Sequence, residues 1–267
     1  MSTDSSYCRP LWVRSRSGSS VAGRRASRAR PSSAPSQHFL RTSALAAQIV
    51  RDACVGADDV VVDIGAGSGR LTGELARAAR RVVAVELDPL WASRLRGRWT
   101  NVDVIEGDAG ALQLPTEPFR VVANLPFGRT TDLLHLLLDD RATPLIQADV
   151  IVEWAVAVRR GLPWPSTVNG VIWGAQYESS ISRRLPRAAF DPVPNTDAGV
   201  VVFRRRREPL IPADLARPYG TFVAGGFRHG LRSVASSSAI GRVAGGRPIA
   251  RDLDAHQWAE LFLNRRR

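Results

Sequence analysis

The chain has 267 residues, and its hydrophobic fraction of 44% and charged fraction of 23% are those of a folded protein that can bury a large core. It has no apolar run long enough to span a membrane, and its two cysteines, Cys8 and Cys54, exclude a disulfide framework. All 37 basic residues are arginine, and against 25 acidic residues they give a net charge of +12, which indicates nucleic acid rather than a membrane surface as the partner.

Half of the excess charge lies in the first 36 residues. This segment has seven Arg, one Asp and eleven Ser, so residues 1–36 are predicted to be a disordered basic arm. An organellar transit peptide has a similar composition and is the alternative. Because no hydrophobic segment of the secretory type is present, a cytoplasmic protein is expected.

Strands and helices alternate from residue 42 onward. Strands are predicted at 59–64, 81–86, 102–106, 119–123 and 199–203, helices at 44–50, 71–80, 89–98 and 132–139, and a further apolar run at 148–158. This alternation predicts an α/β fold with a doubly wound, mostly parallel sheet. From residue 213 only helix-like segments such as 252–262 remain. Two domains are therefore expected, a Rossmann-like domain at 37–207 and a small helical C-terminal domain at 208–267.

A glycine-rich turn follows the first predicted strand. In Asp63-Ile64-Gly65-Ala66-Gly67-Ser68-Gly69 the glycines allow a sharp turn and a close approach to a ligand. The dinucleotide fingerprint requires a further glycine where this chain has Arg70, so the turn fits S-adenosylmethionine (SAM) better than NAD. Similar turns also occur as purely structural features.

Acidic residues end the next two strands. Glu86 lies 21 residues after Gly65, where a carboxylate can accept hydrogen bonds from the ribose hydroxyls of a nucleotide cofactor. Asp108 can accept from the adenine amino group of the same cofactor. The alternatives are a solvated charge at a helix start for Glu86 and a helix N-cap for Asp108.

The most informative tetrapeptide is Asn124-Leu125-Pro126-Phe127, which closes the fourth predicted strand. An exocyclic amine is a poor nucleophile because its lone pair is delocalised into the ring. The side-chain carbonyl of Asn124 and the main-chain carbonyl of Leu125 can accept its two N–H groups, while Pro126 stiffens the loop and Phe127 stacks on a flipped base. This chemistry requires no metal, and no Cys/His spacing in the chain predicts one.

The order of five motifs resembles that of the rRNA adenine-N6 methyltransferase family. They are Gln37-His38-Phe39-Leu40, the glycine turn, Val85-Glu86-Leu87-Asp88, Gly107-Asp108-Ala109 and Asn124-Leu125-Pro126-Phe127. The closest resemblance is to its Erm-type large-subunit members, which confer macrolide–lincosamide–streptogramin B resistance. Segments 151–160 and 190–194 resemble two further family motifs, and the match runs from residue 37 to about 203.

The resemblance implies a class I SAM-dependent methyltransferase domain followed by a helical C-terminal domain. It implies cofactor contacts at His38, Leu40, Gly65, Gly67, Glu86, Asp108 and Asn124. It also implies that Phe190 faces Phe127 across the target base. The implied substrate is an adenine of the peptidyl-transferase loop in 23S rRNA, naked or precursor, and the protein is expected to be a monomer.

Three segments depart from the family pattern. His38 stands where the family usually has Asn, residues 194–198 differ from the usual P-x-V-[DN]-S, and Trp154-Ala155 replaces an aromatic-Gly pair. Arg159, Arg160, Arg204 and Arg205 are candidate contacts to RNA phosphates, with solvated charge runs as the alternative.

Three other functions stay open from the sequence. A small-subunit (KsgA-like) dimethyltransferase is the alternative within the family. A non-catalytic RNA-binding factor on the same fold would not need Asn124 and Phe127. A small-molecule methyltransferase would not need the basic arm or the net charge.

Overall fold

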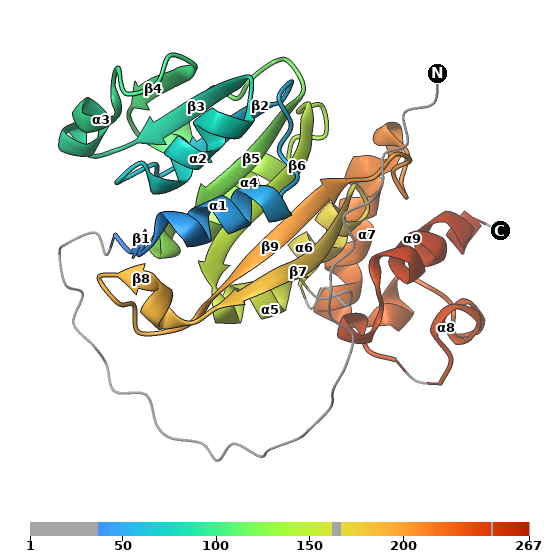
Figure 1. Ribbon diagram of the computed structural model, residues 1–267. Helices are drawn as coiled ribbons and strands as arrows, with labels where there is room; N and C mark the ends of the chain where they lie inside the picture. Colours follow the sequence, from blue (N-terminus) through green and yellow to red (C-terminus); the bar gives the residue numbers. More distant parts are fainter. Residues whose placement is uncertain (1–36, 162–166, 247, 267) are drawn as a thin grey trace, which may run out of the picture.

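The computed structural model describes residues 37–161, 167–246 and 248–266, so the predicted basic arm lies outside the described residues. Seven strands of this part form one sheet (Figure 1). They are β2 (Val60–Ile64), β3 (Arg81–Glu86), β4 (Val102–Glu106), β5 (Phe119–Asn124), β6 (Leu145–Glu153), β7 (Tyr177–Leu185) and β9 (Ala198–Arg205). Their order is β4-β3-β2-β5-β6-β9-β7. The pairs from β4 to β6 are parallel, and β9 runs antiparallel to both of its neighbours, β6 and β7. The expected mostly parallel α/β sheet is confirmed.

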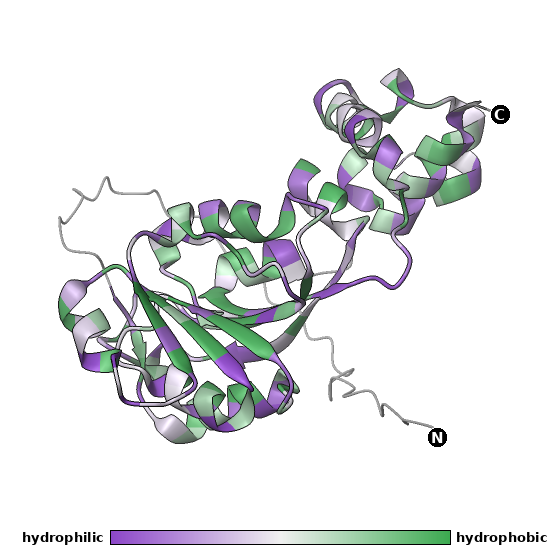
Figure 2. Cartoon of the chain, turned by 90° about the horizontal axis from the view of Figure 1, so that it is seen from above, coloured by the Kyte–Doolittle hydropathy of each residue, from purple (hydrophilic) through white to green (hydrophobic). Residues whose placement is uncertain are grey.

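Helices cover both faces of the sheet. The strands β2 and β3 are runs of β-branched residues because side chains on both faces are buried. One face packs against α1 (Ser43–Asp52), α2 (Arg70–Ala78) and α3 (Pro89–Leu95). The other face packs against α4 (Thr130–Leu138), α5 (Trp154–Gly161) and α6 (Val168–Gly174). In Figure 2 the central strands are largely hydrophobic, whereas the helices carry both kinds of residue.

The apolar run at 148–158 contains two elements. Strand β6 ends at Glu153 and helix α5 begins at Trp154, whose main-chain N–H donates to the carbonyl of Asp197 at 2.8 Å. No Gly, Pro or other turn residue separates the strand from the helix here, so the sequence did not predict the boundary. Strand β7 was not predicted, because its Ser- and Arg-rich sequence lacks a buried apolar pattern.

The C-terminal helices α7 (Ala216–His229), α8 (Ser237–Ala244) and α9 (Ala255–Leu263) form a second core to one side of the sheet (Figures 1 and 2). Trp258 is fully buried there and packs against the rings of Phe222 and Phe227. Helix α6 contributes Val171 to this core, although it precedes residue 208 in the chain. Helix α6 also contributes Trp173 to the core of the sheet, so it packs against both expected domains. The expected domain boundary at residues 207 and 208 stays a prediction.

A small two-stranded ribbon completes the described fold. Strand β1 (Phe39–Leu40) pairs antiparallel with β8 (Phe190–Asp191), and the N–H of Arg41 continues the pairing by donating to the carbonyl of Ala189 at 2.8 Å. This ribbon joins the first described residues to a segment that lies about 150 positions later. It places both beside the carboxyl end of β5.

Candidate functional site

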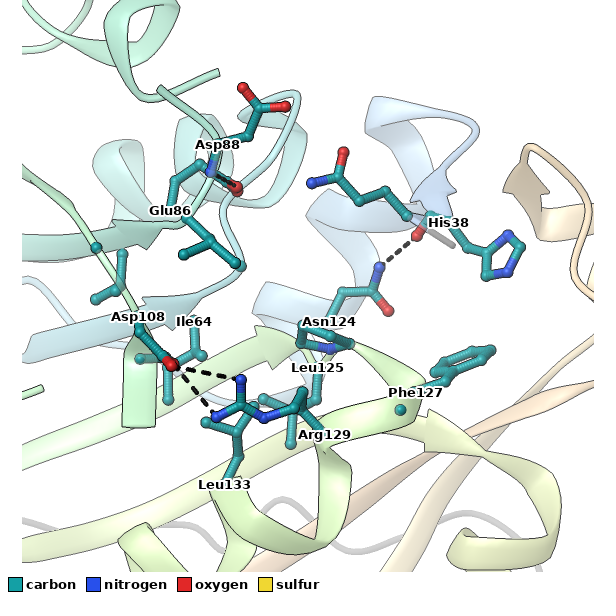
Figure 3. Close-up of a pocket in the computed structure, with 18 of the residues that line it drawn as sticks. His38, Ile64, Glu86, Asp88, Asp108, Asn124, Leu125, Phe127, Arg129 and Leu133 are labelled. Carbon is teal, nitrogen blue, oxygen red and sulfur yellow. Dashed lines mark hydrogen bonds and ion pairs between the residues drawn. The ribbon is translucent and has the colours of Figure 1, made fainter. Parts of the chain in front are cut away.

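A pocket of about 640 Å³ lies at the carboxyl ends of β2, β3, β4 and β5 (Figure 3). Carboxyl ends of neighbouring parallel strands meet at one edge of a sheet, which is where such folds bind ligands. The pocket is lined by Gln37, His38, Phe39, Ile64, Gly65, Val85, Glu86, Leu87, Asp88, Pro89, Gly107, Asp108, Ala109, Asn124, Leu125, Pro126, Phe127, Gly128, Arg129 and Leu133. Four of the five predicted motifs thus contribute several residues to one pocket, and the glycine turn contributes Ile64 and Gly65.

The glycine turn is fixed by Glu86, the acidic residue that ends β3. The carboxylate of Glu86 is 3% exposed and accepts from the N–H of Gly67 at 2.7 Å and from the N–H of Asp88 at 2.8 Å. Gly65 has φ +76° and Gly67 has φ +51°, a region that favours glycine. Gly65 lines the pocket, but Gly67 lies behind it, where a Cβ would come within 2.4 Å of the Phe39 ring.

A second buried carboxylate supports the same turn from below. Asp63 is fully buried at the end of β2 and accepts from the hydroxyl of Thr72 at 2.7 Å. Burial raises its pKa to about 7, since the charged form loses its hydration. This residue stabilises the loop and does not line the pocket.

The first described residues form the pocket's outer wall. His38 lines it, and its Nδ1 lies 2.8 Å from the carbonyl oxygen of Pro192. Leu40 does not line the pocket: its side chain is buried in the core, and its carbonyl accepts from Arg70 at 2.8 Å. Leu40 and Gly67 therefore lie behind the pocket wall and support it. Their direct contact with a cofactor stays a prediction.

Asn124 ends β5 with its side chain turned toward this wall (Figure 3). Its Nδ2 donates to the main-chain carbonyl of His38 at 2.6 Å. Its Oδ1 is buried and has no hydrogen-bond partner among the described residues. Because a buried acceptor without a donor costs free energy, this oxygen is available for a donor that enters the pocket.

Phe127 follows two residues after Leu125 and lines the pocket, whereas Phe190 is fully buried in the core under it. Their ring centroids are 6.3 Å apart at an interplanar angle of 73°, an edge-to-face contact. No base fits between two rings that already touch. In this conformation Phe127 alone can stack on a base, and the predicted sandwich with Phe190 would require the rings to separate.

Asp108 lies on the loop after β4 and faces Arg129, the last residue of the short helix η2 (Phe127–Arg129) (Figure 3). The carboxylate accepts from the N–H of Gly110 at 2.8 Å and from the Arg129 guanidinium at 3.3 and 3.4 Å. The hydrogen bond from the Gly110 N–H and, to a smaller extent, the contact with Arg129 lower the pKa of this carboxyl below its usual value. Asp108 is therefore ionised at neutral pH. Arg129 was not singled out by the sequence, because nothing local to Asn124-Leu125-Pro126-Phe127 marks it.

The four candidate RNA contacts differ in their surroundings. Arg159 is exposed, whereas Arg160 lies over the Trp173 ring at 4.9 Å and donates to the hydroxyl of Thr167 at 2.8 Å. Arg204 donates to the side chain of Gln147 at 2.9 Å, and Arg205 donates to main-chain carbonyls and to the hydroxyl of Tyr177. Only Arg159 of the four is free of internal partners within the described part of the chain.

The ranges that the structure describes hold no membrane-spanning helix, since each of their helices is too short or too polar for that. They contain no cluster of three or more His, Cys, Asp or Glu side chains that could hold a metal ion.

Comparison with known proteins assigns a family to this fold and pocket. The family model described as ribosomal RNA adenine dimethylase matches residues 30–238. An rRNA methyltransferase of Streptomyces thermotolerans is 35% identical over 194 residues, which cover 72% of this chain and 64% of the relative. The mycinamicin-resistance protein MyrB of Micromonospora griseorubida is 32% identical over 216 residues, covering 76% of this chain and 68% of MyrB. The chain thus spans less than two thirds of the Streptomyces relative.

A solved structure agrees with these relatives. The crystal structure of the 23S rRNA methyltransferase ErmE superposes with a TM-score of 0.77 at 26% identity, covering 86% of this chain and all of that chain. The overall fold of this chain therefore recurs in a relative of known structure.

Proposed function

Because the chain belongs to the ribosomal RNA adenine dimethylase family, we propose that it methylates N6 of an adenine in the peptidyl-transferase loop of 23S rRNA with SAM as the methyl donor. Methylation there would confer macrolide-type antibiotic resistance. The observation that carries the proposal is the buried and unpartnered Oδ1 of Asn124 at the edge of the pocket. The description of ErmE as a 23S rRNA methyltransferase supports the large-subunit target, and the name of the mycinamicin-resistance protein MyrB supports a role in resistance.

The pocket fits SAM by the chemistry of its walls. Glu86 stands at the end of β3, where a ribose would lie, and its carboxylate already organises the glycine turn. Asp108, ionised and half-exposed, can accept from the amine of an adenine. Apolar side chains of Ile64, Leu87 and Leu133 supply the surface against which the adenine ring would pack. Bound SAM supplies an electrophilic methyl group.

Asn124 would hold the target amine. Its Nδ2 is already committed to the His38 carbonyl, so its Oδ1 points to the pocket as an acceptor. With the Leu125 carbonyl as the second acceptor, both N–H bonds of the amine would be fixed and its lone pair turned toward the methyl group. Methyl transfer would form the new N–C bond as the S–C bond of the sulfonium breaks, and S-adenosylhomocysteine would be the leaving group. The methylated nitrogen would then release one proton to water, and no strong general base is needed because the positive charge on nitrogen makes that proton acidic.

Phe127 would stack on the flipped adenine, since its ring lines the pocket beside Asn124. Arg159 is the best placed of the four candidate phosphate contacts, because the other three guanidinium groups have internal partners. We further propose naked or precursor 23S rRNA as the substrate, since an assembled subunit would hide the loop, and a monomer as the acting species.

The test is mass spectrometry of 23S and 16S rRNA incubated with SAM and either the wild-type chain or Asn124→Ala. The proposal requires methyladenine in the peptidyl-transferase loop with the wild type and its absence with the variant. Methylation confined to 16S rRNA would move the protein to the small-subunit branch. Equal methylation by both proteins would remove Asn124 from the mechanism.

A further inference from the structure

The ion pair between Arg129 and Asp108 links the short helix η2, which begins at Phe127, to the loop after β4 (Figure 3). Both side chains are about half-exposed, at 44% for Arg129 and 48% for Asp108. A Cβ on Gly110 would lie only 3.0 Å from the Arg129 Nη2, so the guanidinium rests closely on this loop. Arg129 therefore covers the same carboxylate that the proposed function assigns to the adenine of the cofactor.

Asp108 has two kinds of donor with unequal geometry. The N–H of Gly110 is held at 2.8 Å by the chain itself, whereas the two Arg129 contacts are long, at 3.3 and 3.4 Å. Exposed ion pairs of this geometry are weak. When Asp108 accepts from an adenine amine, the contact that gives way is the one to Arg129.

Arg129 then has no strong acidic partner. Its other ion-pair contact, to Asp132, is 3.5 Å long, and the Asp132 side chain is 71% exposed. Arg129 follows Phe127 by two residues in the chain, and both line the pocket in which the flipped base is proposed to bind. The phosphates that flank this base carry negative charge. A guanidinium matches phosphate geometry through paired N–H groups.

From this arrangement we infer that Arg129 is a positioning residue that couples the two substrates: it pairs with Asp108 in the absence of cofactor and with an RNA phosphate beside the target adenosine in its presence. The inference rests on the proposed function and adds a mutual dependence to it. By linkage, cofactor must strengthen RNA binding by the same factor as RNA strengthens cofactor binding.

The test measures binding rather than turnover. The dissociation constant of a transcript of the peptidyl-transferase region is measured with and without saturating S-adenosylhomocysteine, the unreactive cofactor product, for the wild type, Arg129→Gln, Arg129→Lys and Arg77→Gln. Arg77 is a matched control, because it is an exposed arginine paired with Glu74 three residues away and lies outside the pocket. Titration calorimetry gives the affinity of each protein for S-adenosylhomocysteine alone.

The wild type and Arg77→Gln are expected to bind the transcript about fivefold or more tightly with S-adenosylhomocysteine. Arg129→Gln is expected to bind the transcript equally well with and without S-adenosylhomocysteine, at the affinity of the cofactor-free wild type. It is expected to bind S-adenosylhomocysteine itself at least as tightly as the wild type. Arg129→Lys, which keeps the charge, should regain part of the difference.

A wild-type ratio of one, or a ratio unchanged in Arg129→Gln, would overturn the inference while leaving the proposed function intact. Weaker S-adenosylhomocysteine binding by Arg129→Gln would also overturn it, because Arg129 would then support the pocket instead of competing for Asp108. Absence of any RNA binding by the wild type would overturn the proposed function itself.

Discussion

The side-chain Nδ2 of Asn124 donates to the main-chain carbonyl of His38 at 2.6 Å, and this hydrogen bond decides which end of the amide faces the pocket. The partner comes from a segment that is itself held by the β1–β8 pairing. The proposed acceptor, the Asn124 Oδ1, is thus oriented by a residue that lies 86 positions away in the chain. His38 acts here through its main chain, so the departure of its side chain from the family pattern leaves this bond unchanged.

Two substitutions of Asn124 test the separate roles of its Oδ1 as an acceptor and its Nδ2 as a donor. Asn124→Ala removes the acceptor, and loss of one such hydrogen bond in a transition state lowers the rate by about 10²–10³-fold. Asn124→Asp keeps an oxygen toward the pocket but sets a second oxygen against the His38 carbonyl, so it should also lose most activity. Methyl transfer from radiolabelled SAM to rRNA measures both, with S-adenosylhomocysteine binding by Asn124→Ala as the control for folding. Activity of Asn124→Ala near that of the wild type would contradict the assignment.

Substitutions of Phe127 and Phe190 are expected to affect different properties, RNA binding for Phe127 and stability for Phe190. Phe127→Leu keeps an apolar side chain but removes the stacking ring, which is worth about 1–3 kcal/mol per base and hence ~5- to 150-fold in the KM for RNA. Phe127→Tyr should restore the wild-type KM. Steady-state kinetics with a 23S transcript measures these values, and a normal KM for Phe127→Leu would exclude stacking by this ring.

Phe190→Ala should act mainly on stability. The ring is fully buried in the core, and removing a buried phenylalanine costs about 3–5 kcal/mol. Urea unfolding monitored by circular dichroism would give this loss. If the free energy of unfolding were unchanged while RNA binding fell, Phe190 would be a base contact after all, and the edge-to-face packing with Phe127 would have to open in the complex.

Much of this site could be predicted because parallel strands bring their carboxyl ends together. Glu86 and Asn124 end valine-rich strands, and the glycine turn and Asp108 come just after such strands, so local patterns predicted that these residues meet at one edge. The β1–β8 pairing, the burial of Phe190 and the Arg129–Asp108 ion pair could not be predicted this way. Each depends on contacts between segments distant in sequence, and neither a two-residue strand nor a single arginine has a periodic pattern to reveal it.

Gly67 offers a test of the wall behind the pocket. A Cβ at this position would lie 2.4 Å from the Phe39 ring, and the φ of Gly67 is +51°. Gly67→Ala should therefore displace Phe39 together with the neighbouring residue His38. We expect SAM affinity to fall by about tenfold or more, because pocket walls must be held within about 0.5 Å of their working geometry. Calorimetry of S-adenosylhomocysteine binding measures the change. Gly241→Ala is the control, since nothing lies within 4 Å of its added Cβ.

Asp63 predicts how stability depends on pH. Its pKa is about 7 in the folded protein and 3.8 as the reference for the unfolded chain, so the folded state binds the extra proton between these values. The free energy of unfolding should therefore fall as pH rises from 4 to 7 and level off above, by up to about 4 kcal/mol from this group. Asp63→Asn, which keeps an acceptor for Thr72, should flatten this dependence and be more stable than the wild type at pH 8. Urea unfolding at pH 5 and pH 8 measures it, with Asp103→Asn, an exposed carboxylate paired with Arg81, as the control. An equal pH dependence in the wild type and Asp63→Asn would show that Asp63 is ionised throughout, with the Thr72 hydroxyl compensating for its burial.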